Sequence, residues 1–182
     1  MGLLQEEIGY PFNQLPTEMF WTARGGGAGW SSICGTLPPA MAAIGLVVDT
    51  DTAMQLVDEL FGWFMVHPFP EYQPHGEGYA KVAGDSSLCH VQVTKWLAET
   101  GYRQDGPERS DRCGGASADV AKFTIEMLNA YADNAFEAAH APAAVVGECM
   151  ACHGGEGFAD TRGKETCTEC HGNLPDPHPD GY

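Results

Sequence analysis

Apolar residues recur at helical spacing along the chain, and no stretch sustains the two-residue alternation of a half-buried strand. The clearest early example is residues 49–66, whose apolar positions return every three or four residues: Met54, Val57, Leu60, Phe61, Phe64 and Met65. Asp49-Thr50-Asp51-Thr52, at the start of this stretch, supplies N-cap candidates for the helix. The pattern therefore predicts an all-α protein.

Three further helices are expected. A short apolar helix spans residues 39–48, and a second runs from Ser86 or Ser87 to about Glu99. The longest runs from about Ser117 to His140, with a buried apolar stripe made of Val120, Phe123, Met127, Leu128, Tyr131 and Phe136. On the same helix Asp119, Glu126 and Asp133 are expected to face water. Residues 1–33, 67–85 and 101–115 contain proline, glycine and polar breakers and are expected to be irregular.

The composition changes after Pro142. Glycine and proline become frequent, and four of the seven cysteines fall in the last 34 residues. Such a segment cannot bury enough apolar surface to offset the entropy of ordering itself, so we expect it to fold around a cofactor. The expected organisation is a helical domain over residues 1–142, holding three cysteines, and a loop-rich C-terminal segment over residues 143–182.

Two segments match the pattern Cys-x-x-Cys-His: Cys149-Met150-Ala151-Cys152-His153 and Cys167-Thr168-Glu169-Cys170-His171. Two intervening residues let both sulfurs form thioethers with one porphyrin, and the adjacent histidine then binds the iron as its fifth ligand. The sequence predicts two haem c groups per chain, with His153 and His171 as the proximal ligands. A four-cysteine zinc ribbon is the main competitor, but it has no need of a histidine after each second cysteine.

Each haem iron needs a sixth ligand or an open position. Five histidines remain outside the haem motifs. We rank His90 and His178 first as distal ligands, because His90 begins a helix beside Cys89 and His178 follows the second motif. His140 is third, since it ends the helix that leads into the haem segment. His67 and His75 come last, and no methionine is specially placed.

The cysteines of the helical domain are Cys34, Cys89 and Cys113. Buried apolar thiols are the simplest interpretation. Their positions in loops or at helix starts also make them candidate ligands of an iron–sulfur cluster.

Together these features resemble the split-Soret cytochrome c family, within the wider group of cysteine-rich C_GCAxxG_C_C redox-active proteins. The resemblance lies in the residues Gly25–Leu37, Ser87–Val91, Arg112-Cys113, the following long helix through Tyr131, and the two Cys-x-x-Cys-His motifs. It covers most of the chain from about Tyr10 onward.

The resemblance implies a helical homodimer with two closely packed c haems per subunit and haem ligands shared across the interface. It also implies an additional iron–sulfur centre on Cys34, Cys89 and Cys113. Relatives carry a further cysteine-containing segment before Tyr10 that is missing here. A four-thiolate cluster would therefore need a non-cysteine ligand, such as His90, or the cluster has been lost.

The net charge of the chain limits the classes of partner that it can bind. The chain has 25 acidic and 9 basic residues, for a net charge of −16. Such a surface repels nucleic acid and anionic lipid and attracts redox partners with basic patches. No apolar run is long enough to span a membrane. No signal peptide is visible in this chain, although haem c attachment implies a periplasmic or extracellular location.

The favoured hypothesis is a dihaem c-type cytochrome that transfers electrons, rather than an enzyme. The porphyrin performs the electron chemistry, and the protein sets its potential through axial ligands, burial and nearby charge. The alternative is a redox enzyme that reduces a small inorganic substrate at an iron–sulfur or open haem site. A haem module of a larger assembly is a third interpretation.

Overall fold

The computed structural model describes residues 2–76, 78–155 and 162–166 of the chain. They belong to two compact units, residues 1–140 and residues 141–182. Helices dominate, and the β-pairing among the described residues consists of two isolated antiparallel bridges, Ile33 with Leu88 and Phe69 with Val82. The part of the chain that the structure describes is all-α, as the hydrophobic pattern predicts.

The described residues of the first unit form the helices α1 (Gly2–Glu7), α2 (Leu37–Gly45), α3 (Thr50–Val66), α4 (Cys89–Thr100) and α5 (Pro107–Ala132). Two 3₁₀ segments, η1 (Phe12–Gln14) and η2 (Thr17–Ala23), lie between α1 and α2. The second unit contains α6 (Ala144–His153). The expected C-terminal segment is thus helical over its first described part, and most of its remainder lies outside the described residues.

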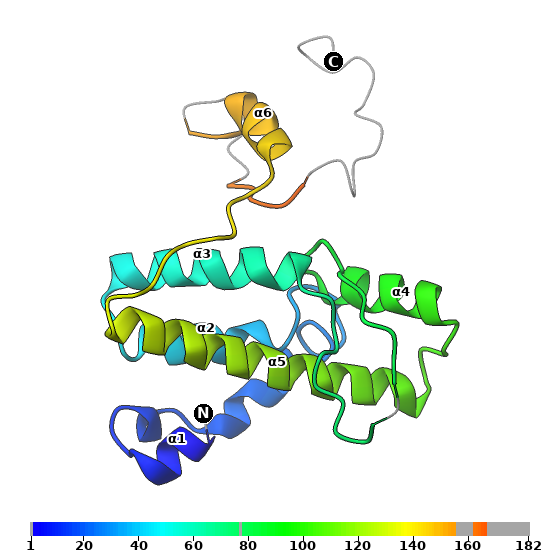
Figure 1. Cartoon of the computed structure of the whole chain (residues 1–182), viewed down its shortest axis with the longest axis horizontal. Coiled ribbons are helices and arrows are strands. Elements are labelled where there is room, and N and C mark those ends of the chain that lie inside the picture. Colours follow the sequence, from blue (N-terminus) through cyan, green and yellow to red (C-terminus); the bar gives the residue numbers. More distant parts are fainter. Residues whose placement is uncertain (1, 77, 156–161, 167–182) are drawn as a thin grey trace. The chain divides into compact units, whose positions relative to one another are not determined.

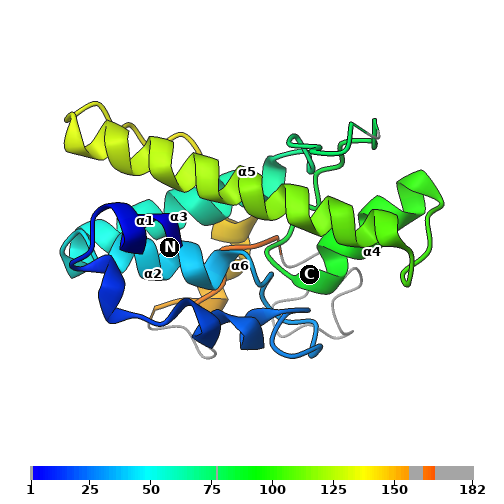
Figure 2. The same ribbon diagram turned by 90° about the horizontal axis from the view of Figure 1, so that it is seen from below.

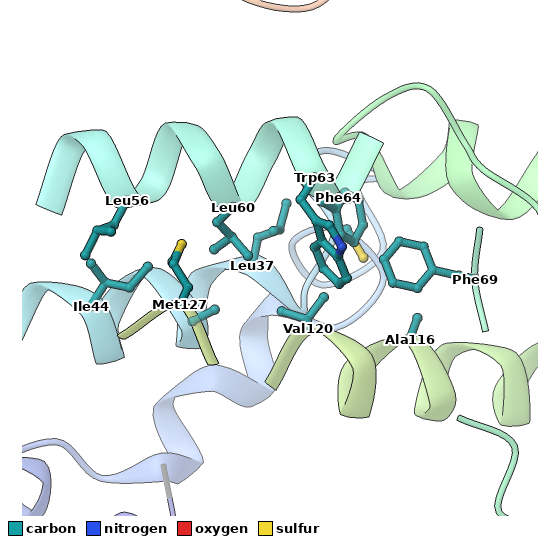
Figure 3. Packing of buried hydrophobic residues seen from close by; sticks show 12 residues of the cluster. Leu37, Ile44, Leu56, Leu60, Trp63, Phe64, Phe69, Ala116, Val120 and Met127 are labelled. Carbon is teal, nitrogen blue, oxygen red and sulfur yellow. The ribbon is translucent and has the colours of Figure 1, made fainter. Parts of the chain in front are cut away.

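The core of the first unit lies between α2, α3 and α5, which pack against one another (Figures 1 and 2). Figure 3 shows side chains from these helices pointing into the same interior, including Leu37, Ile44, Leu56, Leu60, Val120 and Met127. Trp63 stacks on Phe123 with 4.1 Å between the ring centroids. The apolar face of α3 is therefore buried in the core, as the spacing of its apolar residues predicts.

The start of α3 follows from local chemistry. Asp49 has extended backbone geometry, and its Oδ1 accepts hydrogen bonds of 3.1 Å from the amides of Asp51 and Thr52. This is the capping arrangement expected of an aspartate before a helix, where the first amides lack intrahelical partners.

The long helix differs from the prediction at both ends. Residues 107–115, expected as loop, form the first turns of α5, with Pro107 at a position where a missing amide costs nothing. Glycine at position 115 lets the helix pack closely, since a Cβ there would collide with the carbonyl of Tyr72. Tertiary packing thus overrides the weak helix propensity of the two adjacent glycines. The helix ends at Ala132, and Asn134 adopts φ +56°, so His140 lies in an irregular segment and does not end the helix.

The predicted faces of α5 also need two corrections. Asp119 does not face water: it is buried, and its carboxylate accepts hydrogen bonds from the amides of Glu71 (2.8 Å) and Tyr72 (2.9 Å). Tyr131, assigned to the buried stripe, is 39% exposed. Asp119 is polar in sequence yet internal because the irregular segment after α3 needs acceptors for its amides.

Residues before α2 are more helical than expected, since α1, η1 and η2 occupy part of 1–33. At the start of α4, the capping role predicted for Ser86 or Ser87 is only indirect. Leu88 is the N-cap residue, and the Ser86 hydroxyl accepts a 3.1 Å hydrogen bond from its amide.

Candidate redox site

The glycine-rich loop before α2 lies beside the start of α4. The amide of Cys34 donates to the carbonyl of Ser87 (2.8 Å), and the amide of Cys89 donates to the carbonyl of Ser32 (2.7 Å). These two bonds flank the bridge between Ile33 and Leu88. Backbone pairing therefore brings together two cysteines that are 55 positions apart in the sequence.

Gly26 makes this approach possible. It has φ +70°, and a Cβ on it would lie 2.6 Å from the Ser32 amide nitrogen and 2.8 Å from the Cβ of Cys89. Its carbonyl also accepts a 2.8 Å hydrogen bond from the Ser32 hydroxyl. The glycines here shape a tight loop against a cysteine, as a turning backbone requires.

Cys113 joins the same neighbourhood from the second turn of α5. Burial raises the pKa of the Cys89 thiol to about 11, and the nearby Cys34 and Cys113 thiols raise it too, while Arg112 and Arg109 act in the opposite direction. Cys34 is buried, and its Sγ accepts a 3.6 Å hydrogen bond from the Thr36 hydroxyl. The fold thus gathers all three cysteines of the helical domain, and the Cys89 thiol is neutral at pH 7 without a metal.

The three cysteines form no disulfide with one another. Within the described residues, no group of three or more histidine, cysteine, aspartate or glutamate side chains could hold one metal ion. The thiols are close enough to influence one another's charge but do not converge on a single point.

The first haem motif lies at the end of α6. Cys149 and Cys152 are three residues apart in the helix, so they share one face, and His153 is the last helical residue. Gly154 follows in extended geometry, and a Cβ on it would lie 2.7 Å from the carbonyl of Met150. This arrangement fits a porphyrin bonded to both sulfurs with the histidine next to it. The second motif, Cys167, Cys170 and His171, lies outside the described residues, as does His178.

Two of the candidate distal histidines are held through Nδ1. His90 is exposed on the first turn of α4, and its Nδ1 lies 2.7 Å from the carbonyl oxygen of Ser31. Because a carbonyl only accepts, Nδ1 is the donor. Nε2 is then the nitrogen with a lone pair for a metal.

His140 is held more extensively. Its Nδ1 lies 2.6 Å from a carboxylate oxygen of Glu59, whose other oxygen accepts the amides of Ala139 (2.9 Å) and His140 (3.0 Å). Glu59 is only 5% exposed. Burial raises its pKa, but the hydrogen bonds from His140 and Ala139 outweigh this, so the pKa lies below the ordinary value. Gly62 lets the backbone of His140 pack directly against α3, since a Cβ on Gly62 would collide with that backbone.

The last-ranked histidines have other surroundings. His67 stacks on Trp63 with 4.4 Å between centroids, and its Nε2 is 3.7 Å from a carboxylate oxygen of Glu71. His75 lies on the surface, 3.5 Å from a carboxylate oxygen of Asp111.

Sequence reasoning missed two residues. Glu59 reads as an ordinary polar position between apolar ones on α3, and no local signal marks it as the acceptor for residues 80 positions away. Arg112 precedes Cys113 directly, but nothing in the sequence shows that this arginine is 1% exposed. Both are buried charges whose partners come from distant segments.

Clustered thiols on a helical domain, followed by a Cys-x-x-Cys-His helix, define a cysteine-rich redox-type protein. A sequence model of the family described as "Putative redox-active protein (C_GCAxxG_C_C)" matches residues 1–127. The chain belongs to this family, as the resemblance predicts.

The chain is also 34% identical to the split-Soret cytochrome c of Desulfovibrio desulfuricans over 94% of its own length and 65% of that protein. It therefore spans less than two thirds of the curated relative. A solved structure of this cytochrome, described as having a novel iron centre, matches with a TM-score of 0.84 at 34% identity. That match covers 93% of the present chain and 75% of the other. The cysteine-rich helical unit and the haem-motif segment thus both fall in the region of similarity.

Proposed function

We propose that this protein is a dihaem c-type cytochrome that transfers single electrons between redox partners. The observation that carries the proposal is the Cys149/Cys152/His153 constellation at the end of α6, repeated in sequence at Cys167, Cys170 and His171. Similarity to the split-Soret cytochrome c over most of the chain supports it. Haem supplies the one-electron chemistry, and the protein binds it, orients its ligands and tunes its potential.

His140 and His90 are the distal ligands best supported among the described residues. Each is held through Nδ1 by a fixed acceptor, a carboxylate for His140 and a backbone carbonyl for His90. Metal-binding histidines commonly make such bonds, because the acceptor fixes the tautomer and raises the basicity of the other nitrogen. The hydrogen bond to Glu59 supports His140, which ranks third on sequence grounds. His178 remains a candidate on sequence grounds.

The cysteines of the helical unit are proposed to hold an iron–sulfur centre. Three thiols from separate segments are close enough to act on one another's charge, a buried arginine acts on Cys89, and the related cytochrome has a novel iron centre. A single ion does not fit their arrangement. A cluster bridged by sulfide offers several irons over a wider span, which suits thiolates that do not share one point.

The charge of the protein and its proposed cofactors suggest its partners and its location. A net charge of −16 favours partners with basic patches, and their association should weaken as salt rises. Among the described residues, none of the helices has the length and apolar character needed to cross a bilayer. We place the protein in the periplasm or outside the cell, as a homodimer or higher assembly with closely packed haems.

The optical spectrum of the natively produced protein, with a pyridine haemochrome count, tests the proposal. Two haems per chain and a divided reduced Soret band are expected. Replacing Cys149 and Cys152 by serine should lower the count to one. The matched pair, Cys167 and Cys170, should do the same. A colourless protein that contains zinc would overturn the haem assignment.

Carbon monoxide binding separates the carrier from an enzyme with an open haem site. Six-coordinate bis-histidine haem resists carbon monoxide, so the reduced protein should keep its spectrum. Rapid, stoichiometric binding would contradict the carrier with two fully ligated haems.

A further inference from the structure

Arg112 is a buried charge without an opposite charge beside it. Its side chain is 1% exposed. Among the described residues, Arg112 forms no ion pair with a carboxylate. Its Nη2 donates to the Oε1 of Gln92 at 2.9 Å, and its guanidinium lies 5.6 Å from the ring centroid of Phe69. Its Nε has no hydrogen-bond partner.

Gln92 and Phe69, the two side chains that contact Arg112, are both neutral. Gln92 is itself 1% exposed, and its Nε2 donates to the carbonyl of Ser86 at 2.8 Å. Phe69 is fully buried. A guanidinium stays charged in a protein, and burying it beside neutral groups alone is unfavourable. Buried charges are normally paired, so the arrangement calls for an anion.

The cysteines of the helical unit can supply this negative charge, because Arg112 is one of the charges that act on the Cys89 thiol. Cys113 is the next residue along α5, and Gln92 lies one helical turn after Cys89 on α4. Arg112 and Arg109 are the two positive groups that act on Cys89, while the thiols of Cys34 and Cys113 act against them. Of the two arginines, Arg109 is partly exposed and Arg112 is enclosed.

We infer that Arg112 is the internal counter-charge of an anionic iron–sulfur centre on Cys34, Cys89 and Cys113, and that it raises the reduction potential of that centre. The inference rests on the centre proposed above. When the thiols bind metal they lose their protons, and the negative centre then pairs with the guanidinium. Reduction adds one more negative charge, which a neighbouring fixed positive charge stabilises. Arg112 is thus a positioning and tuning residue rather than a ligand.

The test compares R112Q, R112K and the control R103Q in the haem-containing protein. Arg103 is exposed and pairs with the exposed Asp105. The readouts are non-haem iron and acid-labile sulfide per chain, the midpoint potential of the non-haem centre by redox titration with electron paramagnetic resonance, and the rate of iron loss to a chelator. Thermal unfolding is measured with the non-haem iron present and after its removal.

R112Q should lower the midpoint potential and lose non-haem iron about tenfold faster, with two haems per chain retained. After iron removal R112Q should be at least as stable as the wild type, because a buried unpaired charge has been removed. R112K should retain most of the potential and R103Q all of it. If R112Q does not accumulate, R112K alone tests the inference. A midpoint potential of the non-haem centre close to that of the wild type supports it. Loss of the centre although the positive charge is retained refutes it.

Two failures are distinguishable. A wild-type protein without non-haem iron and labile sulfide overturns the proposed centre, and the inference falls with it. A wild-type protein that holds the centre, with R112Q matching its potential and rate of iron loss, leaves the centre standing and overturns the role of Arg112. Equal destabilisation of R112Q with and without iron would show that the arginine is only a packing residue.

Discussion

Substitution of Glu59 tests which hydrogen bonds hold the last residues of the first unit in place. It accepts three N–H groups, from the amides of Ala139 and His140 and from the His140 ring, all between 2.6 and 3.0 Å. Glu59→Ala removes the acceptor for all three. Glu59→Gln keeps one oxygen of similar shape but removes the charge and introduces a donor.

The magnitude follows from which donors can turn to water. The His140 side chain is 28% exposed, so its ring N–H can be hydrated in the variant. The two backbone amides are left without their acceptor, at about 1–3 kcal/mol each if they stay dry. We expect Glu59→Ala to cost about 2–4 kcal/mol in the free energy of unfolding, and Glu59→Gln about 1–2 kcal/mol.

Urea unfolding followed by circular dichroism measures this loss, and hydrogen exchange at residues 139 and 140 locates it. Glu126→Gln is the control, since Glu126 is an exposed carboxylate 3.9 Å from the Nζ of Lys122. Such surface pairs contribute about 0–1 kcal/mol. If Glu59→Ala is no more destabilising than the control, the three hydrogen bonds do not hold this segment and the reasoning is wrong.

Three further perturbations test other parts of the structure. Asp119→Ala should destabilise the unit by about 2–4 kcal/mol, because two buried amides lose their acceptor, with Asp119→Asn recovering part of the loss in the same unfolding assay. Gly26→Ala should cost more than about 1 kcal/mol and lower the content of non-haem iron, since its Cβ would lie 2.8 Å from the Cβ of Cys89; unchanged stability and iron content would contradict the tight loop. Burial lowers the pKa of His67 below 6.5, so the unfolded chain takes up this proton more readily and stability falls as the pH drops below about 6.5. His67→Phe should reduce that loss between pH 7.5 and 5.5, and an unchanged pH profile would contradict the role of His67.

Local signals predicted the helices whose reasons are local. Asp49 caps α3 because its side chain reaches amides two and three residues on, and the apolar spacing of α3 is visible in the sequence itself. The Cys-x-x-Cys-His motifs carry their chemistry in consecutive residues, so the haem prediction needed no fold. Where a helix depends on its neighbours, local signals failed. The first turns of α5 contain Gly114 and Gly115, and only close packing at Gly115 explains why they are helical.

By itself, the sequence determined the helical class, the two Cys-x-x-Cys-His motifs, the net charge of −16 and the identity of the three remaining cysteines. Only the tertiary structure decided which of these residues meet. It brought Cys34 and Cys89 together through backbone pairing, hydrogen-bonded His140 to Glu59, and buried Arg112 against Gln92. The physical reason is that the environment of a buried charge or thiol depends on the groups that contact it. Here those groups lie tens of residues away along the chain. Periodicity reports which face of a helix is apolar, whereas the pairing of buried polar groups depends on how the helices pack.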